Sequence, residues 1–160
     1  MKRYVVILIL IAVAFLTTVG YHLFKPNWVM FRKGEDYFSK KEYPQAIPYY
    51  VSLVKNGFET PKLMDHLGMS YVAIGDYGKA MTIFENINNH SPHKLWSLKE
   101  LANIYVILGR FKEAIILYQT FLQDQPDNRS VRILLARTLT WSLRFEEAIV
   151  EYRKALGEKK

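Results

Sequence analysis

Small and aromatic residues recur along this chain with a constant step of 34 residues. One series consists of glycine and alanine, at Gly34, Gly68, Ala102 and Ala136. A second series consists of alanine alone, at Ala46, Ala80, Ala114 and Ala148, and a third of aromatic residues, at Tyr50, Phe84, Tyr118 and Tyr152. Small side chains let two helices approach closely, and aromatic rings fill the space beside them. The pattern therefore predicts one packing unit that is stacked four times.

Within each unit the apolar residues follow a helical period. Between Pro92 and Tyr105 they are spaced by three and four residues, which is the spacing of one buried helix face. The same spacing returns over residues 113–122, and Gly109 between the two stretches indicates a tight turn. Since no alternating apolar run is bounded by hairpin turns, no strand is expected. We predict an all-α fold of about eight antiparallel helices.

These residues resemble a known repeat. The tetratricopeptide repeat has the signature W-x2-L-G-x2-Y, followed by A-x3-F and then P. The chain contains Leu67-Gly68-x2-Tyr71 with Ala80-x3-Phe84, and Leu101-Ala102-x2-Tyr105 with Ala114-x3-Tyr118. It thus resembles the tetratricopeptide repeat family over residues 27–160, with repeats at 27–60, 61–94, 95–128 and 129–160. The resemblance implies an α-solenoid that binds other proteins.

An apolar run from Tyr4 to Phe24 precedes the repeats. At a rise of about 1.5 Å per residue its length matches the core of a bilayer. The run predicts one N-terminal transmembrane helix, a signal anchor over residues 1–26 that also contacts lipid through residues 4–24. The competing interpretation is a cleaved secretory signal, because small residues at 18–20 suit a peptidase and cleavage would leave a secreted soluble repeat protein.

The predicted location is a single-pass membrane protein with its repeats on the extracytoplasmic, periplasmic side. A short Met-Lys-Arg start before a long apolar run is typical of a signal anchor with this orientation. A strict count of lysine and arginine near the run favours the opposite orientation. The count carries less weight because those bases are interleaved with acids of a folded domain.

Charge and candidate chemistry exclude other classes of function. The net charge is +7, but the repeats carry 19 basic and 15 acidic residues in mixed order, so no nucleic-acid partner is expected. Of the histidines only His90 and His93 are close, and they lie in a turn without a carboxylate or cysteine. With no phosphate-binding glycine loop and no nucleophile elbow, we expect no catalytic residue, no metal site, no cofactor and no enzyme activity.

The resemblance implies that the first helix of each repeat lines a concave groove. Transferring the family's groove positions to this chain gives Trp28, Phe31, Phe38, Met69, Val72, Trp96, Lys99, Asn103, Val106, Ile107, Arg137 and Trp141. All three tryptophans are in this set, and we expect them to anchor an apolar helix or an extended peptide of a partner protein. Trp28 also fits an interfacial residue, and Trp96 a residue that packs on its neighbouring repeat.

Two further features bear on the partner. Lys99 and Asn103 match the first pair of a clamp by which some family members bind acidic carboxyl-terminal tails, but the next clamp position holds Leu134. At the end of the chain, Ile149, Tyr152, Ala155 and Leu156 are expected to be partly uncovered, so that they dock another subunit or the end frays. We therefore expect a membrane-anchored scaffold that acts as an accessory subunit or assembly factor of a membrane or envelope protein complex.

Overall fold

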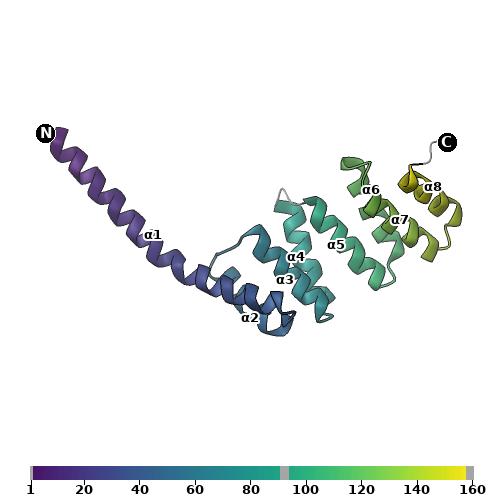
Figure 1. Ribbon diagram of the computed structural model, residues 1–160, viewed down its shortest axis with the longest axis horizontal. Coiled ribbons are helices and arrows are strands. Elements are labelled where there is room, and N and C mark those ends of the chain that lie inside the picture. The colour runs from purple at the N-terminus through teal and green to yellow at the C-terminus, as the bar shows by residue number, and fades with distance from the viewer. Residues whose placement is uncertain (1, 91–93, 158–160) are drawn as a thin grey trace. The chain divides into compact units, whose positions relative to one another are not determined.

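The computed structural model describes residues 2–90 and 94–157. These residues form helices and no strand, which confirms the all-α prediction (Figure 1). The helices are α1 (Lys2–Ser39), α2 (Tyr43–Lys55), α3 (Pro61–Ala73), α4 (Tyr77–His90), α5 (Lys94–Ile107), α6 (Phe111–Asp124), α7 (Arg129–Trp141) and α8 (Phe145–Leu156). The chain divides into an N-terminal unit, Met1–Leu63, and a C-terminal unit, Met64–Lys160, which are described separately.

The N-terminal segment differs from its prediction. Helix α1 runs without interruption from Lys2 to Ser39, so the apolar run and the first repeat helix are one element. In the part of the chain that the structure describes, no helix combines the length and the apolar content that crossing a bilayer requires. The predicted membrane span from Tyr4 to Phe24 and the single-pass membrane location are therefore wrong. The prediction judged the apolar run alone, whereas its helix continues into the charged residues Arg32, Lys33 and Asp36.

Helices of one pair approach closely where the small and aromatic series meet. In the N-terminal unit, a Cβ atom added to Gly34 would lie 2.8 Å from Cε1 of the buried Tyr50. In the C-terminal unit, a Cβ atom added to Gly68 would lie 2.5 Å from Cε1 of Phe84. Real Cβ atoms do not approach a ring this closely, so each aromatic ring occupies the volume that a side chain on the facing helix would need.

We expect Gly68→Ala to destabilise the protein, because the added methyl group overpacks the contact with Phe84 at a cost of about 1–3 kcal/mol. Alanine favours the helical backbone by about 1 kcal/mol, so the measured loss is the overpacking cost less this gain. Gly78→Ala is the matched control, since its added Cβ would meet nothing closer than Asp76 Oδ1 at 3.9 Å. Urea unfolding of both variants checks the prediction, and a Gly68→Ala protein as stable as the Gly78→Ala protein would contradict it.

The turns inside the repeats also follow the 34-residue step. Positive φ angles occur at Lys41 (62°), Gly75 (79°), Gly109 (72°) and Leu143 (63°). At Gly109 the backbone N–H donates to Val106 O at 3.0 Å, and the next N–H donates to Tyr105 O at 2.8 Å. This pair of bonds is a Schellman motif, which satisfies the last carbonyl groups of the helix. Glycine adopts its left-handed conformation without strain, whereas Lys41 and Leu143 carry a Cβ atom there.

Leu143→Gly is expected to raise the free energy of unfolding by about 0.5–1 kcal/mol, because it removes the left-handed strain and only part of that gain is lost to the more flexible unfolded chain. Leu143→Ala is the matched control, since it shortens the exposed side chain but keeps the Cβ atom. Thermal and urea unfolding would show the difference. If glycine and alanine change the stability equally, the effect comes from the side chain and not from the backbone.

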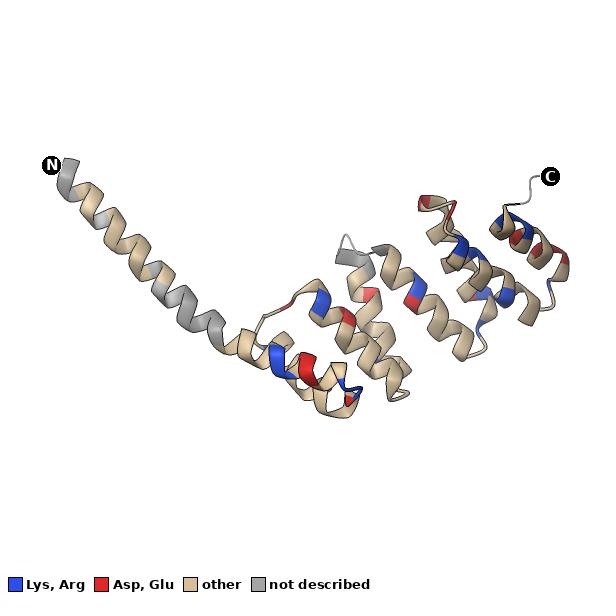
Figure 2. Cartoon of the chain, viewed as in Figure 1, with Lys and Arg blue, Asp and Glu red and all other residues tan. Residues whose placement is uncertain are grey.

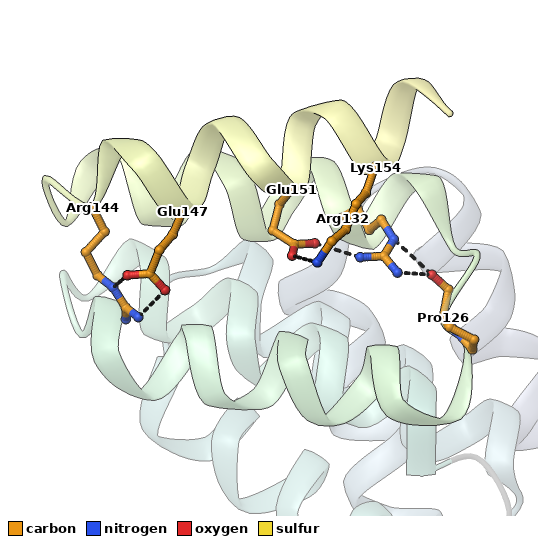
Figure 3. Close-up of polar contacts among 6 residues, drawn as sticks. All are labelled: Pro126, Arg132, Arg144, Glu147, Glu151 and Lys154. Carbon is orange, nitrogen blue, oxygen red and sulfur yellow. Dashed lines mark hydrogen bonds and ion pairs between the residues drawn. The ribbon is translucent and has the colours of Figure 1, made fainter. Parts of the chain in front are cut away.

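The core of the C-terminal unit is continuous from α5 to α8. Tyr118 and Ile115 of α6 belong to one buried cluster with Val131 and Leu135 of α7 and with Ala148 of α8. The last helix pair is also joined by an ion pair. Arg132 and Glu151 are mostly buried side chains whose Nη1 and Oε2 atoms lie 2.7 Å apart across α7 and α8 (Figure 3). This pair stabilises α8 against α7 along the side that carries Ala148.

Candidate functional site

The first turns of α5 and α7 border a cavity of about 450 Å³ in the C-terminal unit. We call it the Trp96 cavity, and it is lined by Leu95, Trp96, Lys99, Phe121, Gln125, Asn128, Ser130 and Val131. Asn128 shapes its edge, because it caps α7 by accepting a hydrogen bond from the backbone N–H of Val131 at 3.1 Å. The cavity is thus built from two first helices and the end of the second helix between them.

Trp96 is half-buried and lies between the core and the cavity. Its indole ring meets the ring of Phe84 edge to face, with centroids 5.2 Å apart and an interplanar angle of 73°. Such edge contacts hold an aromatic side chain in one orientation. Trp96 therefore packs on Phe84 of the preceding repeat and also lines the cavity, and its role as an anchor for a partner stays a prediction.

A polar cluster lies on α5 beyond the cavity. One carboxylate oxygen of Glu100 lies 3.1 Å from Lys99 Nζ, and the other accepts a hydrogen bond from Asn103 Nδ2 at 3.1 Å. Asn103 Oδ1 in turn accepts a hydrogen bond from the Tyr118 hydroxyl at 2.6 Å. Burial raises the pKa of Tyr118, and the negative charge of Glu100 raises it further. The pair that matched a carboxylate clamp already binds a carboxylate of the same chain.

Apolar side chains are exposed at the far ends of the same two helices. Ile107, at the end of α5, is 55% exposed, and Trp141, at the end of α7, is 48% exposed. The guanidinium of Arg137 lies 5.2 Å from the centroid of the Trp141 ring, whose other neighbour is the ring of Phe111 at 6.3 Å. Contacts on two sides orient the indole while leaving about half of it accessible.

The remaining residues of the predicted groove lie in varied surroundings. Val106 is partly buried against the core, Val72 is half-buried, and Met69 is exposed. In the N-terminal unit Phe31 is only 7% exposed and forms an aromatic cluster with Trp28 and Phe58. Trp28 is half-exposed beside Phe58, and Phe38 is half-buried beside Tyr43. The structure therefore places Phe31 in the core, away from a binding surface.

The family model of the tetratricopeptide repeat matches residues 71–137. Over these residues the chain is similar to the tetratricopeptide repeat. The matched residues span α4 to α6 and most of α7, and so include much of the Trp96 cavity and the polar cluster. Stacked repeats of this kind form extended surfaces that serve as scaffolds for protein–protein interactions, as the sequence predicted.

Solved structures show the same fold. MamA from AMB-1 is 24% identical, with a TM-score of 0.70 over 84% of this chain and 73% of that chain. Another crystal structure of MamA is 17% identical, with a TM-score of 0.75 over 84% and 74% of the two chains. MamA from Desulfovibrio magneticus RS-1 is 15% identical, with a TM-score of 0.74 over 83% and 75%. No curated protein matches the chain. These identities establish the fold alone.

Several lining residues of the Trp96 cavity were not predicted. Phe121 and Gln125 lie at the end of α6, and Asn128 lies in the loop before α7. The tetratricopeptide groove positions come from first helices only, so a transfer of those positions omits the second helix. Pro126 could have indicated these residues from the sequence. A proline here predicts that the second helix ends just before it, so the residues on either side of Pro126 lie at a helix end.

Metal binding finds no support among the described residues. There, no group of three or more histidine, cysteine, aspartate and glutamate side chains is placed to hold an ion. His93, half of the histidine pair considered from the sequence, lies outside the described residues. The described residues of α5 and α7 offer two apolar ends with a polar cluster between them.

The hydrogen bond between Tyr118 and Asn103 is expected to contribute to stability. Tyr118→Phe should cost about 1 kcal/mol, and Asn103→Ala about 1–3 kcal/mol because it leaves a buried hydroxyl without its acceptor. The double variant should cost clearly less than the sum of the two, since neither partner remains. Urea unfolding of the four proteins measures this coupling. Additive losses would show that the hydroxyl and the amide do not interact.

Proposed function

We propose that this protein is an interaction scaffold that binds one amphipathic segment of a partner protein, as a helix or an extended strand, along α5 and α7. The binding surface, here the α5–α7 face, consists of Trp96, Lys99, Asn103, Val106, Ile107, Arg137 and Trp141. The observation that carries the proposal is the order of the surface: the Trp96 cavity at one end, exposed Ile107 and Trp141 at the other, and a polar cluster between them.

The two ends supply apolar anchoring points. A cavity of about 450 Å³ falls within the range of about 300–1,000 Å³ that is usual for ligand pockets, and it admits a large apolar side chain. Trp141 offers a broad apolar ring that is already oriented by Arg137 and Phe111, so little conformational freedom is lost on binding. Buried aromatic anchors of this kind carry most of the energy at protein interfaces.

The polar centre argues against recognition of a free carboxylate. An external carboxylate at Lys99 and Asn103 would have to displace Glu100 and compete with its negative charge. Displacement would also disturb the hydrogen bond that Asn103 accepts from the buried Tyr118. A partner segment that crosses this centre with neutral polar groups meets neither penalty.

In the cell the same surface suits an accessory subunit or an assembly factor of a protein complex. The two roles differ in the lifetime and stoichiometry of the bound partner. Affinity purification followed by mass spectrometry would recover partners in constant stoichiometry with a subunit, and a changing set of weakly held clients with an assembly factor. Trp141→Ala as bait distinguishes partners of the α5–α7 face from background.

We expect Trp141→Ala to weaken binding of a partner peptide by about 2 kcal/mol or more while the melting curve stays nearly unchanged, because half of this ring is exposed. Lys99→Ala should change affinity little, added salt should change it only a few fold, and binding should show the negative heat-capacity change of apolar burial. Calorimetry with the purified partner's peptide measures all three quantities.

The matched control is Ile116→Ala, which removes an apolar side chain that is 59% exposed on α6, outside the α5–α7 face. This variant should bind like the unmodified protein. The proposal fails if Lys99→Ala or amidation of the peptide's carboxyl terminus abolishes binding, or if affinity falls steeply with salt. Those results would instead support a carboxylate clamp.

A further inference from the structure

The last helix exposes residues whose counterparts one repeat earlier are buried. In α6, Ile115, Tyr118 and Leu122 lie in the core cluster that includes the side chains of α7. The residues 34 positions later, Ile149, Tyr152 and Leu156 of α8, are 50%, 36% and 63% exposed. The face of α8 that corresponds to the α7-covered face of α6 therefore presents the same kind of apolar surface to solvent.

These residues form a continuous line along the whole helix. Phe145, which is 54% exposed, extends the series to Phe145, Ile149, Tyr152 and Leu156. The steps of four, three and four residues are those of the a and d positions of a heptad, the pattern by which two helices pack along a seam. Ala148 and Ala155 are buried on a different side, so packing among the described residues, 2–90 and 94–157, leaves this seam largely exposed.

The charges along α8 indicate what kind of partner fits against the seam. Acidic residues, Glu146 and Glu147, occupy the first turn, and basic residues, Arg153 and Lys154, the last turn (Figure 2). In the heptad register Glu146 and Arg153 are seven residues apart and flank the seam on one side. Glu147 and Lys154 point elsewhere, where they pair with Arg144 and Glu151 of the same chain (Figure 3).

We propose that two copies of this chain associate through their α8 seams, with the two helices antiparallel about a two-fold axis. In this arrangement Glu146 of each copy meets Arg153 of the other copy, and Phe145 packs near Leu156. In a parallel arrangement Glu146 and Arg153 would face the g positions of the other helix, which are Ala148 and Ala155, and would have no ion-pair partner. A two-fold contact is closed, so association stops at the dimer.

The expected affinity follows from the size of the seam. A pair of three-turn helices buries less than the roughly 1,600 Å² of a standard protein interface. The seam therefore forms a weak dimer, with a dissociation constant in the micromolar range, and not an obligate one. The seam lies on α8 apart from the α5–α7 face, so the dimer presents two copies of that face, which raises the avidity for a partner with two binding segments.

Sedimentation equilibrium of the full 160-residue chain over a range of micromolar concentrations tests the dimer. Ile149→Glu should make the protein monomeric, while the matched change Ile116→Glu, at an exposed position outside the seam, should leave the dimer intact. Circular dichroism and melting curves check that both variants fold. A chain that is monomeric throughout, or an association that Ile149→Glu does not alter, overturns the proposal.

Charge reversal tests the antiparallel pairing without removing apolar surface. Glu146→Arg alone and Arg153→Glu alone should each weaken the dimer about tenfold or more, and the double reversal should restore it, because the opposite charges again face each other. If the double variant is no tighter than the single variants, the antiparallel arrangement is wrong. The double charge reversal remains a valid test even if Ile149→Glu unfolds α8.

The absence of cysteine from the chain permits a direct geometric test. A mixture of Glu146→Cys protein and Arg153→Cys protein should form disulfide-linked pairs between unlike copies under mild oxidation. Each variant alone should cross-link much less, because like positions lie at opposite ends of the seam. Cross-linking of Glu146→Cys protein with itself as efficient as that of the mixture would contradict the antiparallel arrangement.

Discussion

The contact between a small residue on one helix and an aromatic ring on the next is the constraint on which the rest of this structure depends. Phe84 reaches so close to Gly68 that even a methyl group there would overlap its ring, and Tyr50 lies almost as close to Gly34. The contact sets the distance between two helices of a pair. Since it recurs at one register position, each pair presents its first helix in the same way, and similar positions can build one binding surface.

The same register explains where polar groups enter the core. Tyr50 donates a hydrogen bond to Glu35 at 2.7 Å, and Tyr118 donates one to Asn103 at 2.6 Å, so an aromatic hydroxyl is satisfied by a residue on the facing helix. In the second repeat the corresponding residues are Phe84 and Met69, which have neither the hydroxyl nor an acceptor side chain. The two pairs with a tyrosine therefore have a polar side chain on the facing helix, whereas the pair with Phe84 has an apolar one. This difference makes the centre of the α5–α7 face polar.

The surface properties of the C-terminal unit follow from which faces the next helix covers. Helix α7 covers the apolar face of α6, whereas the equivalent face of α8 is exposed in the part of the chain that the structure describes. Ala148, Ala155 and the ion pair between Arg132 and Glu151 determine which side of α8 turns inward. The side that remains outward has both the apolar seam and the charges that suit a second copy.

The sequence by itself determined the all-α fold class and the 34-residue spacing of the small and aromatic residues. Helix type and packing faces repeat every 34 residues, and short-range spacing encodes them, so the small and aromatic series and the last helix, Phe145–Leu156, were predictable. Only the tertiary structure showed that Phe31 is buried, that Glu100 occupies Lys99 and Asn103, and that the end of α6 helps to form the cavity. It also corrected the membrane span, because it joined the apolar run and the first repeat helix into one element. Such features depend on which side chains meet across different helices, and no local pattern in a single segment records those meetings.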